Sequence, residues 1–132
     1  MNEVQEIRNS KNTFELEGNV ARINKIYTNK NGKKTLRFDL GQNTKGDSQF
    51  VPVVIKGELV NTYGKEIQKG DWICVKGIIT SYNKPIEKEG REYNNKVIEI
   101  LGFEIEDRKN HKTFTSDGRV KDISVNKEEM ER

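Results

Sequence analysis

The sequence predicts an all-β protein with one short helix, folded into a small barrel. Only 32% of the 132 residues are hydrophobic and 34% are charged, which suits a thin barrel with a large wet surface better than a helical bundle. Several stretches alternate apolar and polar side chains, which is the period of a strand, whereas residues 58–69 carry apolar side chains at helical spacing. The chain is therefore expected to form one domain, residues 13–106, between an N-terminal arm, 1–12, and a polar C-terminal tail, 107–132.

The first predicted strand begins at Phe14. Phe14, Leu16 and Val20 alternate with polar residues, and Gly18 stands where a barrel strand bends or bulges. The apolar pattern continues through Ile26. This strand leads into a turn with three lysines.

A hairpin signal, Asn31-Gly32, separates the first two strands. The second strand follows with two distinct faces. Its core face is Leu36, Phe38 and Leu40, and its other face is Thr35, Arg37 and Asp39. Residues 41–49 are then expected to form a long, mobile polar loop.

The third strand, residues 50–57, has two faces that differ in chemistry. Val51, Val53 and Ile55 are expected to face the core because successive strand side chains point to opposite sides. The other side carries Phe50, Pro52, Val54 and Lys56. This aromatic and basic face is typical of a binding surface. Burial on both faces is the alternative, but lysine is rarely buried unpaired, and proline cannot donate to a sheet ladder.

The remaining elements are a short helix at 58–69, which is expected to cap the barrel, and two more strands. In the fourth strand, 71–82, Ile73 and Val75 take the core face. The outer face then holds Trp72, Cys74 and Lys76. Residues 83–92 are expected to be a charged, turn-rich connection to a last strand at 93–106, where residues 97–101 do not alternate cleanly.

The sequence contains no arrangement typical of an enzyme or a metal site. His111 lies in the polar tail and Cys74 lies in the middle of a strand, and neither has a partner that the sequence places near it. One cysteine and one histidine exclude an internal disulfide and a zinc cluster. We therefore expect no catalysis, no cofactor and no small-molecule substrate. No long apolar run occurs, so we expect a cytoplasmic protein without a membrane partner.

Five motifs in order resemble the bacterial and phage single-stranded DNA-binding protein family. The strongest are Phe50 to Gly57 with Glu58-Leu59, followed by Lys69 to Gly77. The others are Phe14 to Val20, Leu36 to Leu40, and the turn Gly90-Arg91-Glu92-Tyr93. The resemblance covers roughly residues 13–106. It implies an oligonucleotide-binding (OB) fold, which is a five-stranded Greek-key barrel with a helix between strands 3 and 4.

An OB-fold binds oligonucleotides across its second and third strands and the loops after its first and fourth strands. In this chain those elements hold basic side chains and two aromatic rings. The candidate nucleic-acid-binding residues are Lys30, Lys33, Lys34, Arg37, Phe50, Lys56, Tyr82, Lys84, Lys88 and Arg91, with Tyr27 and Tyr93 as weaker stacking candidates. The net charge is only +3, so any electrostatic site depends on such local clusters.

The resemblance also implies oligomers, usually tetramers, that meet partly through the outer sheet. Trp72, Cys74 and Lys76 are therefore the candidate interface of a homo-oligomer, a tetramer or a dimer. Two departures from the family are visible. The chain has Lys56 where many members have a second aromatic residue, and Asn126 to Arg132 lacks the acidic tail with an apolar tip that recruits the usual partners.

Three functions stay open at this point. The first is sequence-nonspecific binding of single-stranded DNA that protects exposed strands in DNA replication, recombination or transfer. The second is a primosome-type accessory module whose barrel face binds protein. The third is an RNA-binding barrel, which stacking aromatics alone do not separate from the first.

Overall fold

The computed structural model describes residues 10–122, which form eight strands and one short helix. The elements in chain order are β1 Phe14–Ile23, β2 Tyr27–Thr28, β3 Lys34–Thr44, β4 Asp47–Lys56, α1 Glu58–Thr62, the 3-10 turn η1 Tyr63–Lys65, β5 Trp72–Lys88, β6 Arg91–Asp107, β7 Lys112–Thr115 and β8 Val120–Asp122. Within this range no helix is long and apolar enough to cross a membrane.

Five of the strands close into a barrel in the order β1, β3, β4, β6, β5 and back to β1. All neighbours are antiparallel except β4 and β6, whose parallel pairing joins Val53 to Ile100 and Val54 to Leu101. With α1 between β4 and β5, this is the predicted OB-fold.

The barrel core contains most of the side chains that the alternation assigned to it, but not Val51, which is only partly buried at the start of the barrel part of β4. Leu36, Phe38 and Leu40 of β3 are fully buried. They meet residues from the neighbouring strands and from the helix, namely Val20, Val53, Ile55, Leu59, Val60, Tyr63, Ile73, Val75 and Ile105. The short helix thus closes one end of the barrel, as predicted, although it ends at Thr62 and continues only as the turn η1.

The two long polar segments are hairpins, not loops. Residues 41–49 continue β3 and β4 around a turn at Lys45 and Gly46, and residues 83–92 continue β5 and β6 around a turn at Glu89 and Gly90. All four turn residues have positive φ, between 52° and 85°. Two such residues form the tight turn whose twist matches that of the flanking strands, so both ladders extend to their tips.

Two details of the strands also differ from the prediction. The first strand ends at Ile23, and Ile26 is exposed outside it. Its bulge falls between Val20 and Arg22, not at Gly18. Gly18 is needed for a different reason, because a Cβ atom there would lie 2.1 Å from the carbonyl oxygen of Gly41 on the neighbouring strand.

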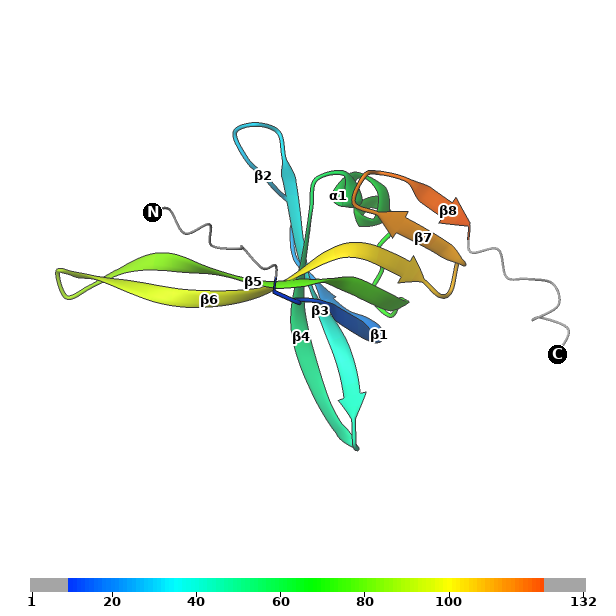
Figure 1. Ribbon diagram of the computed structural model, residues 1–132, viewed down its shortest axis with the longest axis horizontal. Helices are drawn as coiled ribbons and strands as arrows, with labels where there is room; N and C mark the ends of the chain where they lie inside the picture. The colour runs from blue at the N-terminus through cyan, green and yellow to red at the C-terminus, as the bar shows by residue number, and fades with distance from the viewer. Residues whose placement is uncertain (1–9, 123–132) are drawn as a thin grey trace, which may run out of the picture.

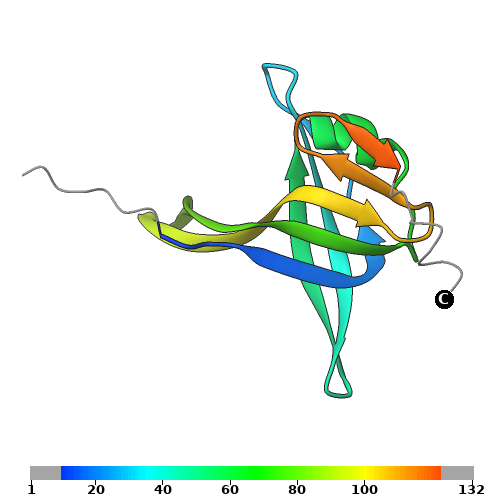
Figure 2. The ribbon, with the colours of Figure 1, turned by 45° about the vertical axis from the view of Figure 1, so that its right-hand side comes forward.

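The chain beyond Asp107, where the sequence analysis expected a polar tail that could pack locally, begins with two further strands. Strands β7 and β8 form a hairpin that pairs with the end of β6 and lies beside α1 (Figure 1, Figure 2). Phe114 of β7 is fully buried, and its ring centroid lies 5.2 Å from that of Tyr63. The core therefore includes residues beyond 106. The described residues do not include positions 1–9 of the predicted arm or positions 123–132 of the tail. The predicted departure from the family at Asn126 to Arg132 therefore lies outside them.

Candidate nucleic-acid interface

Three projections leave the barrel, and each carries predicted site residues. The β2–β3 turn, the β3–β4 hairpin and the β5–β6 arm point in three different directions (Figure 1). The turn holds Lys30, Lys33 and Lys34, the β3–β4 sheet holds Arg37, Phe50 and Lys56, and the arm holds Tyr82, Lys84, Lys88 and Arg91. The predicted residues are therefore spread over a wide surface, and only some of them lie close together.

The outer face of β3 and β4 has the residues that the alternation assigned to it. Directly opposed residues of an antiparallel pair share a face. Arg37 stands opposite Val54, and Gly41 stands opposite Phe50. Phe50 is 65% exposed, and nothing larger than a glycine stands beside it across the ladder.

The prediction for Val54 was wrong in one respect, because this residue of the outer face is only 2% exposed. It does not belong to the barrel core, so its side chain is covered from the outside. Val54 lines a small cavity of about 170 Å³ together with Arg37, Pro52, Tyr82 and Ile98, among others, and these neighbours shield it from solvent. This cavity joins the barrel face to the β5–β6 arm.

An ion pair crosses this junction. The Nη2 atom of Arg37 donates to Oε1 of Glu99 on β6 at 3.1 Å, and the Glu99 side chain is only 11% exposed. Glu99 was not among the predicted site residues, because residues 97–101 lack a clean alternation. Arg37 therefore presents a charge that is already shared with a carboxylate, which weakens its attraction for a phosphate compared with a free guanidinium.

One face of the β5–β6 arm combines aromatic and basic side chains. Cross-strand pairing places Tyr82, Lys84, Ile86 and Lys88 on the same side as Val97, Asn95, Tyr93 and Arg91. Tyr82 is 44% exposed and Tyr93 is 49% exposed. Lys88 and Arg91 flank the tip, six residues or about 20 Å beyond Tyr82 at the rise of a strand.

The lysine-bearing turn is held in a defined shape. The side-chain oxygen of Asn29 accepts from the backbone N–H groups of Asn31 and Lys33 at 2.9 and 2.8 Å. The backbone N–H of Gly57 donates to the carbonyl oxygen of Lys34 at 2.9 Å, which ties the turn to the end of β4. Lys33 and Lys56 consequently line the same groove.

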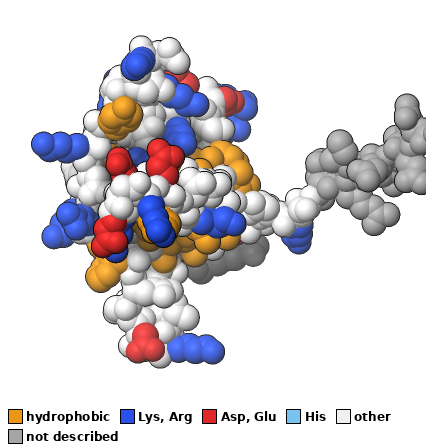
Figure 3. Space-filling view, turned by 90° about the vertical axis from the view of Figure 1, so that its left-hand side faces the viewer, with side chains coloured by type: hydrophobic (Ala, Val, Ile, Leu, Met, Phe, Trp, Pro, Cys, Tyr) orange, Lys and Arg blue, Asp and Glu red, His pale blue; other side chains and the backbone are white. Residues whose placement is uncertain are grey.

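Charge on this side of the molecule is mixed. A view along the arm shows Lys and Arg side chains around the whole face with Asp and Glu side chains among them, not one continuous basic patch (Figure 3). This agrees with the net charge of only +3. Any electrostatic binding on this face depends on the individual basic clusters.

The outer face of β5, opposite Ile73 and Val75, holds the predicted interface residues. Trp72 is 46% exposed, and its Nε1–H donates to Oε1 of Glu17 at 2.8 Å. Cys74 is buried despite its outward direction, and its thiol donates to Oε1 of Glu15 at 3.4 Å. Burial, with the neighbouring Glu15, raises the pKa of Cys74 to about 11, so the group stays a thiol at neutral pH.

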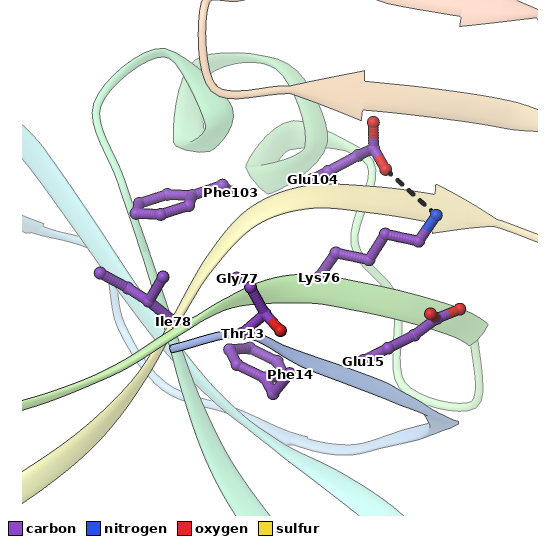
Figure 4. Close-up of a pocket in the computed structure, with 8 residues that line it drawn as sticks. All are labelled: Thr13, Phe14, Glu15, Lys76, Gly77, Ile78, Phe103 and Glu104. Atoms are coloured by element: carbon purple, nitrogen blue, oxygen red, sulfur yellow. Dashed lines mark ion pairs between the residues drawn. The ribbon is translucent and has the colours of Figure 1, made fainter. Parts of the chain in front are cut away.

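Lys76 on the same face is paired with two carboxylates. Its Nζ atom lies 3.4 Å from Oε1 of Glu106. It also lies 3.6 Å from Oε2 of Glu104, a pair that Figure 4 shows. The charge of Glu106 raises the pKa of Lys76. Both interactions are partly exposed, so their contribution to stability is small.

The closed five-stranded barrel with α1 between β4 and β5 defines an OB-fold protein, and its outer surface carries exposed aromatic and basic side chains. Residues 11–105 match the model of the Single-strand binding protein family, and the chain belongs to that family. Single-stranded DNA binding is the activity of this family. A comparison with curated proteins finds no match. The family match ends before β7, so the β7–β8 hairpin lies outside it.

Proposed function

We propose that this protein binds single-stranded DNA without sequence preference, and that it protects exposed strands during replication, recombination or transfer in the cytoplasm. The observation that carries the proposal is the junction at which Tyr82 of the arm and Arg37 of the barrel line one cavity. Phe50 adds an exposed ring on the same outer face of the barrel as Arg37.

The chemistry of an unpaired strand suits these groups. Unpaired bases expose π-faces that stack on rings, and the backbone presents one phosphate per nucleotide to lysine and arginine. Stacking depends little on the identity of the base. The exposed rings and basic clusters therefore support nonspecific binding.

Titration of fluorescently labelled oligonucleotides tests this proposal. We expect poly-dT to bind much more tightly than duplex DNA of the same length, because paired bases cannot reach the rings. The logarithm of the binding constant should fall linearly with the logarithm of salt concentration, with a slope of about −0.7 per neutralised phosphate. Equal affinity for duplex would contradict the proposal, and tighter binding of poly-rU than of poly-dT would favour an RNA-binding barrel.

We also propose that the protein forms a homo-oligomer, a tetramer rather than a dimer, through the outer face of β5. Trp72 supports this because a half-exposed tryptophan can pack across a two-fold axis in a symmetric assembly. The paired state of Lys76 is compatible with an interface, since its charge already has acidic neighbours. Linking several barrels lengthens the track for one strand and raises affinity through effective concentration.

Light scattering checks the assembly. We expect a mass of about four times the 15.3 kDa chain for the wild type, and dissociation for Trp72→Glu, whose charge is costly to bury at an interface. Trp72→Phe is the matched control and should stay assembled. The Trp72→Glu monomer should still bind short oligonucleotides weakly. A wild type that is monomeric at tens of micromolar would refute the assembly without touching the binding proposal.

A further inference from the structure

A β-bulge on β6 turns one aromatic side chain toward the outside. Lys76 pairs with Glu104 and Gly77 pairs with Gly102, so Phe103 has no partner on β5. Bulges insert one extra residue into a strand and re-aim its side chain. Phe103 and Glu104 leave the strand in different directions, and Glu104 reaches Lys76 (Figure 4).

The residues on either side of the bulge show why both side chains point outward. Gly102 faces the core, because a Cβ atom there would lie 2.8 Å from Val75. Ile105 is fully buried in the core. The two residues between them therefore both lie on the outer face, and Phe103 is 40% exposed. Strict alternation would have placed one of them inside.

Phe103 lines an open groove of about 260 Å³ together with two lysines. The groove runs between β6, the end of β4 and the β7–β8 turn, and its walls include Lys33, Lys56, Leu101, Glu58 and Ser116. Lys33 and Lys56 are exposed, and neither forms an ion pair with another residue of the range 10–122. Their charge is thus available to an anion, whereas Arg37 is shared with Glu99.

This groove continues the outer barrel face of Arg37 and Val54 along two adjacent strands, β4 and β6. Val54 and Leu101 are paired across β4 and β6. Lys56 lies two residues beyond Val54, and Phe103 lies two residues beyond Leu101, so each step is about 7 Å along the same face. A strand that occupies the cavity at Arg37 and Tyr82 can therefore extend into the groove without crossing to another side of the barrel.

We propose that this groove is an additional nucleotide subsite, in which one base stacks on Phe103 and Lys33 and Lys56 neutralise its phosphates. The subsite rests on the proposed single-strand binding. Glu58 also lines the groove, on the side of Gly118 in the β7–β8 turn, and its carboxylate repels a phosphate from its vicinity. Ser116 adds a hydroxyl from the turn between β7 and β8, a part of the chain outside the family match.

Fluorescence anisotropy with a length series of oligo-dT tests the subsite in the full chain. We expect Phe103→Ala to bind long oligo-dT about 5- to 150-fold more weakly, the range that corresponds to loss of one stacked base. Phe103→Tyr should retain wild-type affinity because it keeps the ring. The shortest oligonucleotides, which fill only the cavity lined by Arg37 and Tyr82, should bind Phe103→Ala and wild type equally.

Lysine variants provide a second readout. The double variant Lys33→Ala/Lys56→Ala should have a salt slope that is less steep by about 0.7 for each phosphate that the lysines no longer neutralise. Lys65→Ala, which changes an exposed lysine outside this groove, is the control and should keep the wild-type slope.

The outcomes separate failure of the subsite from failure of single-strand binding. If wild type binds oligo-dT and Phe50→Ala weakens it while Phe103→Ala matches wild type at every length, the subsite is refuted and the proposed function stands. If Phe103→Ala instead lowers the mass measured by light scattering, the groove is a contact between protomers and the subsite is refuted. If wild type fails to bind oligo-dT, the proposed function itself is wrong.

Discussion

Replacing Phe114 with alanine is expected to lower the free energy of unfolding by about 3–5 kcal/mol, the cost of removing a buried aromatic ring from a packed core. Phe114 is fully buried, and it stacks at a tilt against Tyr63. Tyr63 in turn donates its hydroxyl to Asp71 at 3.1 Å, and burial raises its pKa above the usual range. The cavity left by the lost ring cannot collapse easily against this anchored neighbour. Urea denaturation followed by circular dichroism measures the loss.

Val120→Ala is the matched control for this experiment. Val120 pairs with Phe114 in the same hairpin but is 47% exposed, so its truncation should change stability by less than about 0.5 kcal/mol. Equal, small losses for both variants would show that the β7–β8 hairpin is an appendage. A large loss for Phe114→Ala alone makes this hairpin part of the cooperative fold.

The double variant Phe50→Ala/Tyr82→Ala is expected to weaken poly-dT binding by about 2–6 kcal/mol, if each ring stacks on one base at about 1–3 kcal/mol. Such values are known for OB-fold proteins of this kind. The two rings lie on separate hairpins, so their contributions should add approximately. Both rings are exposed, and the melting temperature should therefore stay close to that of the wild type.

Ile79→Ala is the control for this binding experiment. Ile79 is 46% exposed on β5, as Tyr82 is 44% exposed, but it lies at an odd step from Tyr82 and therefore points to the opposite face of the arm. It should leave poly-dT binding unchanged. A double variant that binds like the wild type but melts at a much lower temperature would assign Phe50 and Tyr82 to packing, not to stacking.

Local sequence pattern was enough to predict the strands of the barrel and the facing of most of them. Alternation in Leu36-Arg37-Phe38-Asp39-Leu40 is sufficient because one face of an antiparallel strand packs on the core and the other meets water. A shift of one residue would expose all three apolar side chains, so such a pattern allows only one of the two faces to pack on the core. The helix at Leu59, Val60 and Tyr63 was predictable for the same reason, with a period of 3.6.

Features that depend on contacts between distant segments could not be predicted from local pattern. Lys45-Gly46 and Glu89-Gly90 do not by themselves distinguish a loose loop from a tight turn, and the choice follows from the ladders on either side. Phe114 is one apolar residue in a polar segment, and it is buried because β6 offers a free edge for β7 to pair with.

The composition of the candidate site was decided in the same way. Glu99 and Arg37 form an ion pair although they lie 62 positions apart in the sequence. The bulge that exposes Phe103 arises because β6 has one more residue than β5 between two consecutive pairs of their ladder, Lys76 with Glu104 and Gly77 with Gly102. Local pattern reports which side of a strand a residue occupies, provided the strand is regular. It carries no information on which residue of another strand arrives opposite, because register across a barrel is set by packing of the whole core.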